Sequence, residues 1–256
     1  MTIRLGRILG IRVSLHVSWF LILGLVALGS ARSYAEVDPT LSRPVLMIMG
    51  TATALLFFAC LLAHELGHAL VARRLGIPVQ GITLFLLGGL SEISEEIGTP
   101  GNEFAIALAG PLVSAALGGA FAAAAYATEG PTEAVAASLA LGNVFLAVFN
   151  LIPGLPLDGG RLLRAGIWRL TGDRRRATLI GVVIGRLLAL ALLILGVVVL
   201  TRGSSAGVWY LLMALFLDQA ARAAGRRRPA RPDGVALPRD AHSPTDAEPP
   251  PEQSSG

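Results

Sequence analysis

The feature that most constrains the fold of this chain is a series of charge-poor, apolar stretches, each about 20 residues long. A helix of that length crosses the hydrocarbon core of a bilayer. The composition agrees, because 54% of the 256 residues are hydrophobic and only 15% are charged. We therefore predict an all-α polytopic membrane protein with six transmembrane helices, at residues 13–31, 44–72, 104–128, 134–157, 177–201 and 203–221.

Arginines flank these stretches unevenly and predict their orientation. All 21 basic residues are arginine, and most of them precede the first stretch, follow the second, lie at 161–176 or follow the sixth. Because basic residues concentrate on the cytoplasmic side, we expect a multi-pass protein of the cytoplasmic membrane with both termini in the cytoplasm. Arginines beside apolar segments account for the net charge of +4, so membrane lipid is an expected partner and nucleic acid is not.

Two segments differ from the spans. Residues 79–97 combine β-branched and aromatic residues with Gly88 and Gly89, which predicts a small membrane-associated β-hairpin. Residues 223–256 hold seven of the 15 prolines and lack apolar periodicity, which predicts a disordered, Arg/Pro-rich cytoplasmic tail. We therefore divide the chain into an intramembrane domain at 1–222 and this tail.

Residues 61–74, LLAHELGHALVARR, place metal-binding side chains inside the second apolar stretch. His64 and His68 are four residues apart, so on a helix both imidazoles project from one face and can bind a single Zn²⁺. Glu65 lies beside them, placed to act on a water at the metal, in the H-E-x-x-H arrangement. Hydrogen-bonded core histidines are the alternative, but burying a carboxylate beside them is costly unless a cation compensates. Cys60 is a further possible ligand, although such a cysteine is usually a small hydrophobic residue.

A catalytic zinc site has three protein ligands and an open position, so a third donor must come from another segment. Asp158 in NLIPGLPLDGGR is the candidate, because it follows a proline-broken turn at the end of the fourth stretch. Such irregular backbone is tolerated at membrane depth where protein covers it or it lines a wet cavity. Alone, this aspartate is typical of an ordinary turn. However, His68 is about 7 Å along a helix from Arg73, and Asp158 precedes an Arg-rich loop, so both lie near the cytoplasmic face.

The motif HELGH and the later N-x-x-P-x-x-P-L-D-G resemble those of the site-2 protease family of intramembrane zinc metalloproteases. The opening RILGIRVSLHVSWF, the Gly-Gly hairpin and the E-x-x-x-A-x-A-G-P run from Glu103 to Pro111 are also similar, and the likeness covers most of residues 1–222. Many members of the family carry PDZ or CBS domains. We expect neither here, which corresponds to a short form of the family.

The resemblance implies one Zn²⁺ per chain, bound by His64, His68 and Asp158, with Glu65 as the catalytic base. Asn150 matches the asparagine that precedes the prolines in the family, whose role would be to orient substrate or support the transition state. The implied activity is that of a zinc metalloendopeptidase that hydrolyses peptide bonds within transmembrane segments. Its substrates would be membrane-anchored regulatory proteins, such as transcriptional regulators or anti-sigma factors.

The hairpin offers a candidate substrate site at Leu86, Leu87, Gly88 and Gly89. A transmembrane substrate must unwind before cleavage, and an extended segment can add to a strand edge. A metal-binding membrane transporter or channel is the alternative function, with histidine and aspartate lining an ion path. Glu65 favours the protease, because transport needs no base beside the ligands. An inactive protease-like scaffold is disfavoured, because every catalytic position is filled.

Overall fold

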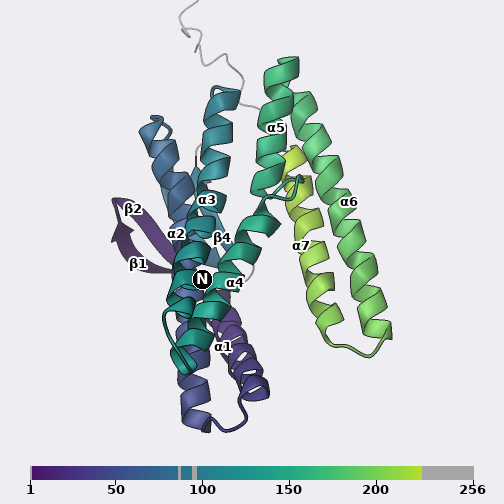
Figure 1. Cartoon of the computed structure of the whole chain (residues 1–256). Coiled ribbons are helices and arrows are strands. Elements are labelled where there is room, and N and C mark those ends of the chain that lie inside the picture. The colour runs from purple at the N-terminus through teal and green to yellow at the C-terminus, as the bar shows by residue number, and fades with distance from the viewer. Residues whose placement is uncertain (1, 86–87, 94–96, 227–256) are drawn as a thin grey trace, which may run out of the picture.

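The computed structural model describes residues 2–85, 88–93 and 97–226, which form seven helices and a four-stranded sheet (Figure 1). The helices are α1 (Ser18–Val37), α2 (Arg43–Arg74), α3 (Pro100–Tyr126), α4 (Pro131–Asn150), α5 (Asp158–Thr171), α6 (Arg174–Thr201) and α7 (Ala206–Arg226). The strands are β1 (Thr2–Ile8), β2 (Ile11–His16), β3 (Val79–Phe85) and β4 (Gly88–Ile93). Five helices, α1, α2, α3, α4 and α6, are long and apolar enough to cross a membrane. The prediction of a mainly helical integral membrane protein is thus confirmed. The predicted tail at 223–256 is wrong at its start, because residues 223–226 are the end of α7, and from residue 227 onward it lies outside the described residues.

The first predicted span is wrong at its start, because residues 13–16 belong to strand β2 and α1 begins only at Ser18. In β2, the buried side chains of Ile11, Val13 and Leu15 alternate with more exposed ones. This period of two is typical of a strand. The strand runs almost directly into an apolar helix, so hydropathy alone does not separate the two.

The predicted hairpin at 79–97 is present as β3 and β4, but within a larger sheet. The strand order is β1-β2-β3-β4, so β3 is paired on both sides and β4 forms one edge. β2 and β3 are parallel, whereas the other two pairs are antiparallel. The sheet packs on α1 and α2 through one buried cluster, formed by Ile11, Leu15, Trp19, Phe58, Leu61, Ala69, Ile82 and Leu84. The sheet therefore fixes the helix that carries both histidines.

The predicted span at 134–157 is also wrong as a single helix. Helix α4 ends at Asn150, and the chain then turns through Pro153 and Pro156, which have no N–H group with which to continue a helix. The Arg-rich region expected to be a loop instead forms α5, which begins at Asp158. This helix is amphipathic and of low mean hydropathy, which is why a search for apolar runs misses it.

Helix α5 lies between α3 and α6 (Figure 1). Where the turn before α5 meets α5 and α6, the backbones approach very closely. A Cβ at Gly160 would lie 2.3 Å from the carbonyl carbon of Gly154, and one at Gly185 would lie 1.9 Å from the carbonyl oxygen of Leu155. The N–H of Leu155 also donates to the carbonyl of Gly181 at 3.0 Å. The turn before Asp158 is therefore held against α6 by contacts that only glycine permits.

Candidate metal centre

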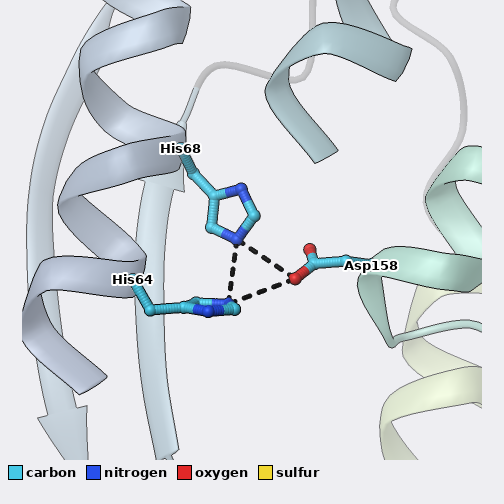
Figure 2. A group of neighbouring side chains, drawn as sticks. All are labelled: His64, His68 and Asp158. Carbon is cyan, nitrogen blue, oxygen red and sulfur yellow. Dashed lines mark hydrogen bonds and ion pairs between the residues drawn. The ribbon is translucent and has the colours of Figure 1, made fainter. Parts of the chain in front are cut away.

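Figure 2 shows three side chains that converge from two helices: His64 and His68 from α2, and Asp158 from the start of α5. The Nε2 atoms of His64 and His68 lie 3.2 and 3.1 Å from Asp158 Oδ2, and 3.2 Å from each other. All three residues are buried. Among the residues that the structure describes, this is the group of ligand-type side chains close enough together to hold a metal ion, and Cys60 is not part of it.

The spacing of the three donor atoms fits tetrahedral coordination. Zinc binds imidazole nitrogen and carboxylate oxygen at about 2.0–2.2 Å, so two such ligands at the tetrahedral angle lie about 3.3–3.5 Å apart. The three measured separations, 3.1, 3.2 and 3.2 Å, are close to this value. A set of two imidazoles and one carboxylate is also a donor set used by catalytic zinc.

Contacts on the outer side of each imidazole orient the ring. His68 Nδ1 lies 2.6 Å from the carbonyl oxygen of Ile106 on α3, and because a carbonyl only accepts, Nδ1 carries the hydrogen. In the neutral ring, Nε2 then carries no hydrogen and can only accept. It lies 3.1 Å from Asp158 Oδ2, which is also an acceptor. Two acceptors at this distance repel each other unless a cation lies between them. The arrangement therefore fits a bound metal, with the second nitrogen of each ring engaged by α3: His64 Nδ1 is hydrogen-bonded to Ser114 Oγ at 2.9 Å.

Gly110 on α3 places backbone without a side chain beside the two imidazoles. A Cβ at this position would lie 2.2 Å from His68 Nε2 and 2.6 Å from His64 Nε2. The first carbon of any side chain would thus enter the space that both nitrogens face. The absence of a side chain at Gly110 therefore keeps carbon out of the position that the two nitrogens face.

The carboxylate of Asp158 has two different neighbours. Oδ2 faces the histidines, whereas Oδ1 lies 3.6 Å from a guanidinium nitrogen of Arg161, one turn later on α5. With one oxygen near a fixed cation and the other directed at the centre, the carboxylate is oriented as a ligand to the metal position.

Glu65 and Asn150, the residues expected to support catalysis, lie on α2, which carries the histidines, and on α4, which packs against α2 and α3. Glu65 is partly buried on α2, between the two histidines in sequence. Asn150 is the last residue of α4, and its side-chain nitrogen donates to the carbonyl of Leu146 at 2.9 Å. The structure thus brings together His64, His68 and Asp158, while the roles of Glu65 and Asn150 remain predictions.

The residues expected to bind substrate lie at the β3–β4 hairpin. Leu86 and Leu87 are outside the described residues. Gly88 and Gly89 are the first residues of β4, paired with Phe85 and Leu84 of β3. Their role in substrate binding also remains a prediction.

Three contributors to the centre, all on α3, were not expected from the sequence: Gly110, Ser114 and the carbonyl group of Ile106. Gly110 lies in the A-x-A-G-P run, so its place in a motif of the site-2 protease family could have indicated a role at the centre. Ser114 and Ile106 carry none, because serine and main-chain carbonyl groups occur throughout apolar helices.

Comparison with known proteins identifies the family. The family model described as Peptidase family M50 matches residues 52–136 and 122–194, which together include His64, His68 and Asp158. The chain belongs to peptidase family M50. The predicted family resemblance is confirmed.

Relatives of this M50 family member come from bacteria and archaea. The chain is 44% identical over 230 residues to sll0528 of Synechocystis sp. and 42% identical over 226 residues to Rip3 of Mycobacterium tuberculosis, each a proposed zinc metalloprotease. These matches cover 88% and 86% of the chain but 60% and 58% of the relatives, so the chain spans about three fifths of their length. A solved structure, the site-2 protease from Methanocaldococcus jannaschii, is similar with a TM-score of 0.62 and 29% identity, covering 90% of this chain and 97% of that one.

Gly110→Ala tests whether the space between the imidazoles holds the metal. We expect this M50 family member to lose bound zinc on the substitution, because the new Cβ would lie 2.2 Å from His68 Nε2. Glycine to alanine within a helix otherwise tends to stabilise by about 1 kcal/mol. Gly119→Ala is the matched control, since a Cβ there meets nothing within 4 Å on the same helix. The measurement is zinc per chain in purified, folded protein; equal zinc in both variants would show that the metal lies elsewhere.

Proposed function

We propose that this chain is an intramembrane zinc metalloendopeptidase that cleaves within transmembrane segments of membrane-anchored regulatory proteins. The observation that carries the proposal is the buried set of His64, His68 and Asp158, with donor atoms 3.1–3.2 Å apart beside the side-chain-free backbone of Gly110. Membership of a peptidase family supports hydrolysis as the reaction. The names of the relatives support zinc as the metal, and the one ligand group found among the described residues fits one ion per chain. Zinc would supply Lewis-acid chemistry, activating a water molecule and polarising the scissile carbonyl.

The residues of the chain have separate roles in this proposal. His64, His68 and Asp158 hold the metal, and the contacts from Ile106 and Ser114 keep both imidazoles directed at it. The Glu65 carboxylate is the general base: it takes a proton from the attacking water and passes it to the nitrogen of the leaving amine. Asn150 orients the substrate or supports the transition state. A metal transporter would need no such base.

The outer edge of β4 is the proposed docking site for an unwound substrate. Because β3 is paired with both β2 and β4, the outer edge of this hairpin belongs to β4 alone. An extended peptide can pair with such an edge through its main chain. This would hold a substrate segment extended beside α2, against which β3 and β4 pack.

Both termini are proposed to face the cytoplasm, with α7 as a sixth span. Helix α7 begins at Ala206, shortly after α6 ends at Thr201, and runs back along α6 (Figure 1). Its Asp218 is paired with Arg186 of α6 at 3.1 Å and with Arg222 at 2.7 Å. Such pairing lowers the cost of charged groups at the edge of a bilayer, and the long arginine side chains can extend toward the cytoplasmic headgroups.

Glu65→Gln separates metal binding from catalysis. We expect this variant to keep its zinc and to lose cleavage by about 100-fold or more, because the base is absent. His68→Ala and Asp158→Ala should instead lose zinc. The measurements are zinc content and the membrane proteome of cells that carry each variant, searched for fragments that end within transmembrane segments.

Glu129→Gln, in the α3–α4 connection, is the control. Fragments that are undiminished with Glu65→Gln would contradict the role of Glu65, and none from the native protein would contradict the protease.

Proline substitutions test strand addition at β4. Of two adjacent residues in β4, one N–H group faces β3 and the other faces outward. Gly89→Pro and Leu90→Pro each remove one N–H group, and one of these two groups faces outward. The variant that loses the outward N–H group should cleave less substrate. It should keep its zinc content and its unfolding temperature, because the hydrogen bonds between β3 and β4 are intact. Alanine at the same positions should have a milder effect. If both proline variants produce native amounts of the fragments, substrate does not pair with β4.

Cysteine labelling tests the orientation. In a Cys60→Ala background, we expect an impermeant thiol reagent outside the cell to modify a cysteine at Glu129 and to spare one at Asp173. Residue 129 follows α3, and residue 173 lies between α5 and α6. The reverse pattern would invert the topology and move the metal centre to the outer side of the membrane.

A further inference from the structure

Glu103 and Arg164 form a buried ion pair between α3 and α5. Arg164 Nε donates to Glu103 Oε1 at 2.6 Å, and Nη2 contacts the same oxygen. Glu103 has no exposed surface, and the Arg164 side chain is 15% exposed. The second oxygen, Oε2, is buried without a hydrogen-bond partner among the described residues. A charged pair with one unsatisfied oxygen is a costly arrangement inside a protein.

The cost of this arrangement indicates a role other than net stability. Desolvation offsets most of the attraction within a buried ion pair, and apolar side chains of similar volume are often as stable in its place. A guanidinium and a carboxylate do, however, interact at a defined separation and orientation, which apolar surfaces do not impose. The pair is therefore suited to fixing one helix relative to another.

The two helices that the pair joins both contribute to the metal centre. Ile106, whose carbonyl accepts from His68, lies three residues after Glu103, about 4.5 Å along α3. Asp158 lies six residues before Arg164, about 9 Å along α5. Because α3 packs against both α2 and α5, it sets the position of the aspartate relative to the two histidines.

We propose that the Glu103–Arg164 ion pair is a positioning device for Asp158, which fixes α5 along α3 so that Oδ2 reaches both imidazoles. This inference rests on the proposed zinc site. Arg161 orients the carboxylate within α5, whereas the ion pair determines where the whole helix lies. Glu103 and Arg164 are thus positioning residues, and they touch neither metal nor substrate.

The test compares metal binding with folding in the full chain. In the double variant Glu103→Leu/Arg164→Met, apolar residues of similar volume replace the pair. We expect its metal-free form to unfold at a temperature close to that of the native protein. Its zinc affinity should fall about 10–100-fold, the range for residues that support metal ligands, and we expect its zinc to transfer to a chelator correspondingly faster. The visible absorption bands of its cobalt-substituted form, which report ligand geometry, should change.

Two further variants make the test decisive. Arg169→Met removes an exposed arginine from the same helix and should leave zinc release and the cobalt spectrum unchanged. Arg164→Lys keeps the charge without the planar guanidinium and should release zinc at an intermediate rate. If the double variant fails to fold, Arg164→Lys decides the question.

The positioning role would be overturned if the folded double variant released zinc at the native rate and had the native cobalt spectrum. If the double variant is unfolded, the same result in Arg164→Lys would overturn it. Either result would leave the proposed function intact. A native protein that binds no zinc would instead overturn the proposed function.

Discussion

Two imidazole nitrogens and a carboxylate oxygen that face one another within 3.2 Å among apolar helices are the constraint around which this structure is arranged. Because His68 Nδ1 donates to the Ile106 carbonyl, the neutral His68 ring presents only a lone pair to Asp158 Oδ2, and a cation between these two atoms would satisfy both. The ligands also come from separate segments, since His64 and Asp158 are 94 positions apart in the sequence. Helix α3 connects these segments, because it packs against α2 and α5 and supplies the Ile106 carbonyl, the Ser114 hydroxyl and the side-chain-free backbone at Gly110. A helix that contributes no ligand thus determines how the ligands are directed.

Close approach of backbones is the means by which these helices meet. Between membrane helices there is little hydrophobic driving force, so association depends on packing and favours small residues. A Cβ at Gly67 of α2 would lie 3.2 Å from the carbonyl oxygen of Ala109, next to Gly110 on α3. Glycine weakens a helix by roughly 0.5–1 kcal/mol relative to alanine. In this structure the glycines lie where a side chain would collide with the backbone of a neighbouring helix, as at Gly67, or with the imidazoles of the metal centre, as at Gly110.

The sequence predicts the parts of this structure that have a local signal. Long apolar runs locate α2, α3 and α6 to within a few residues, and the two motifs identify His64, His68 and Asp158. The remaining features depend on contacts between distant segments. Strand β2 is defined by its pairing with β3, and Ser114 matters only because α3 lies beside His64. Helix α5 is short and amphipathic, so neither its length nor its hydropathy distinguishes it from a loop.

Asp158 has no transmembrane helix of its own to hold it, and its position depends on packing from two directions. On one side, the irregular turn before it is covered by α6, where the N–H of Leu155 pairs with Gly181 and the carbonyl of Leu155 lies against Gly185. Such cover is what non-helical backbone at membrane depth requires. On the other side, α5 packs against α3. The histidines have a second support in the sheet, on which α2 packs through Phe58, Leu61 and Ala69. Both halves of the ligand set therefore rest on α3, whereas the sheet supports only the half with the histidines and α6 covers only the half with the aspartate.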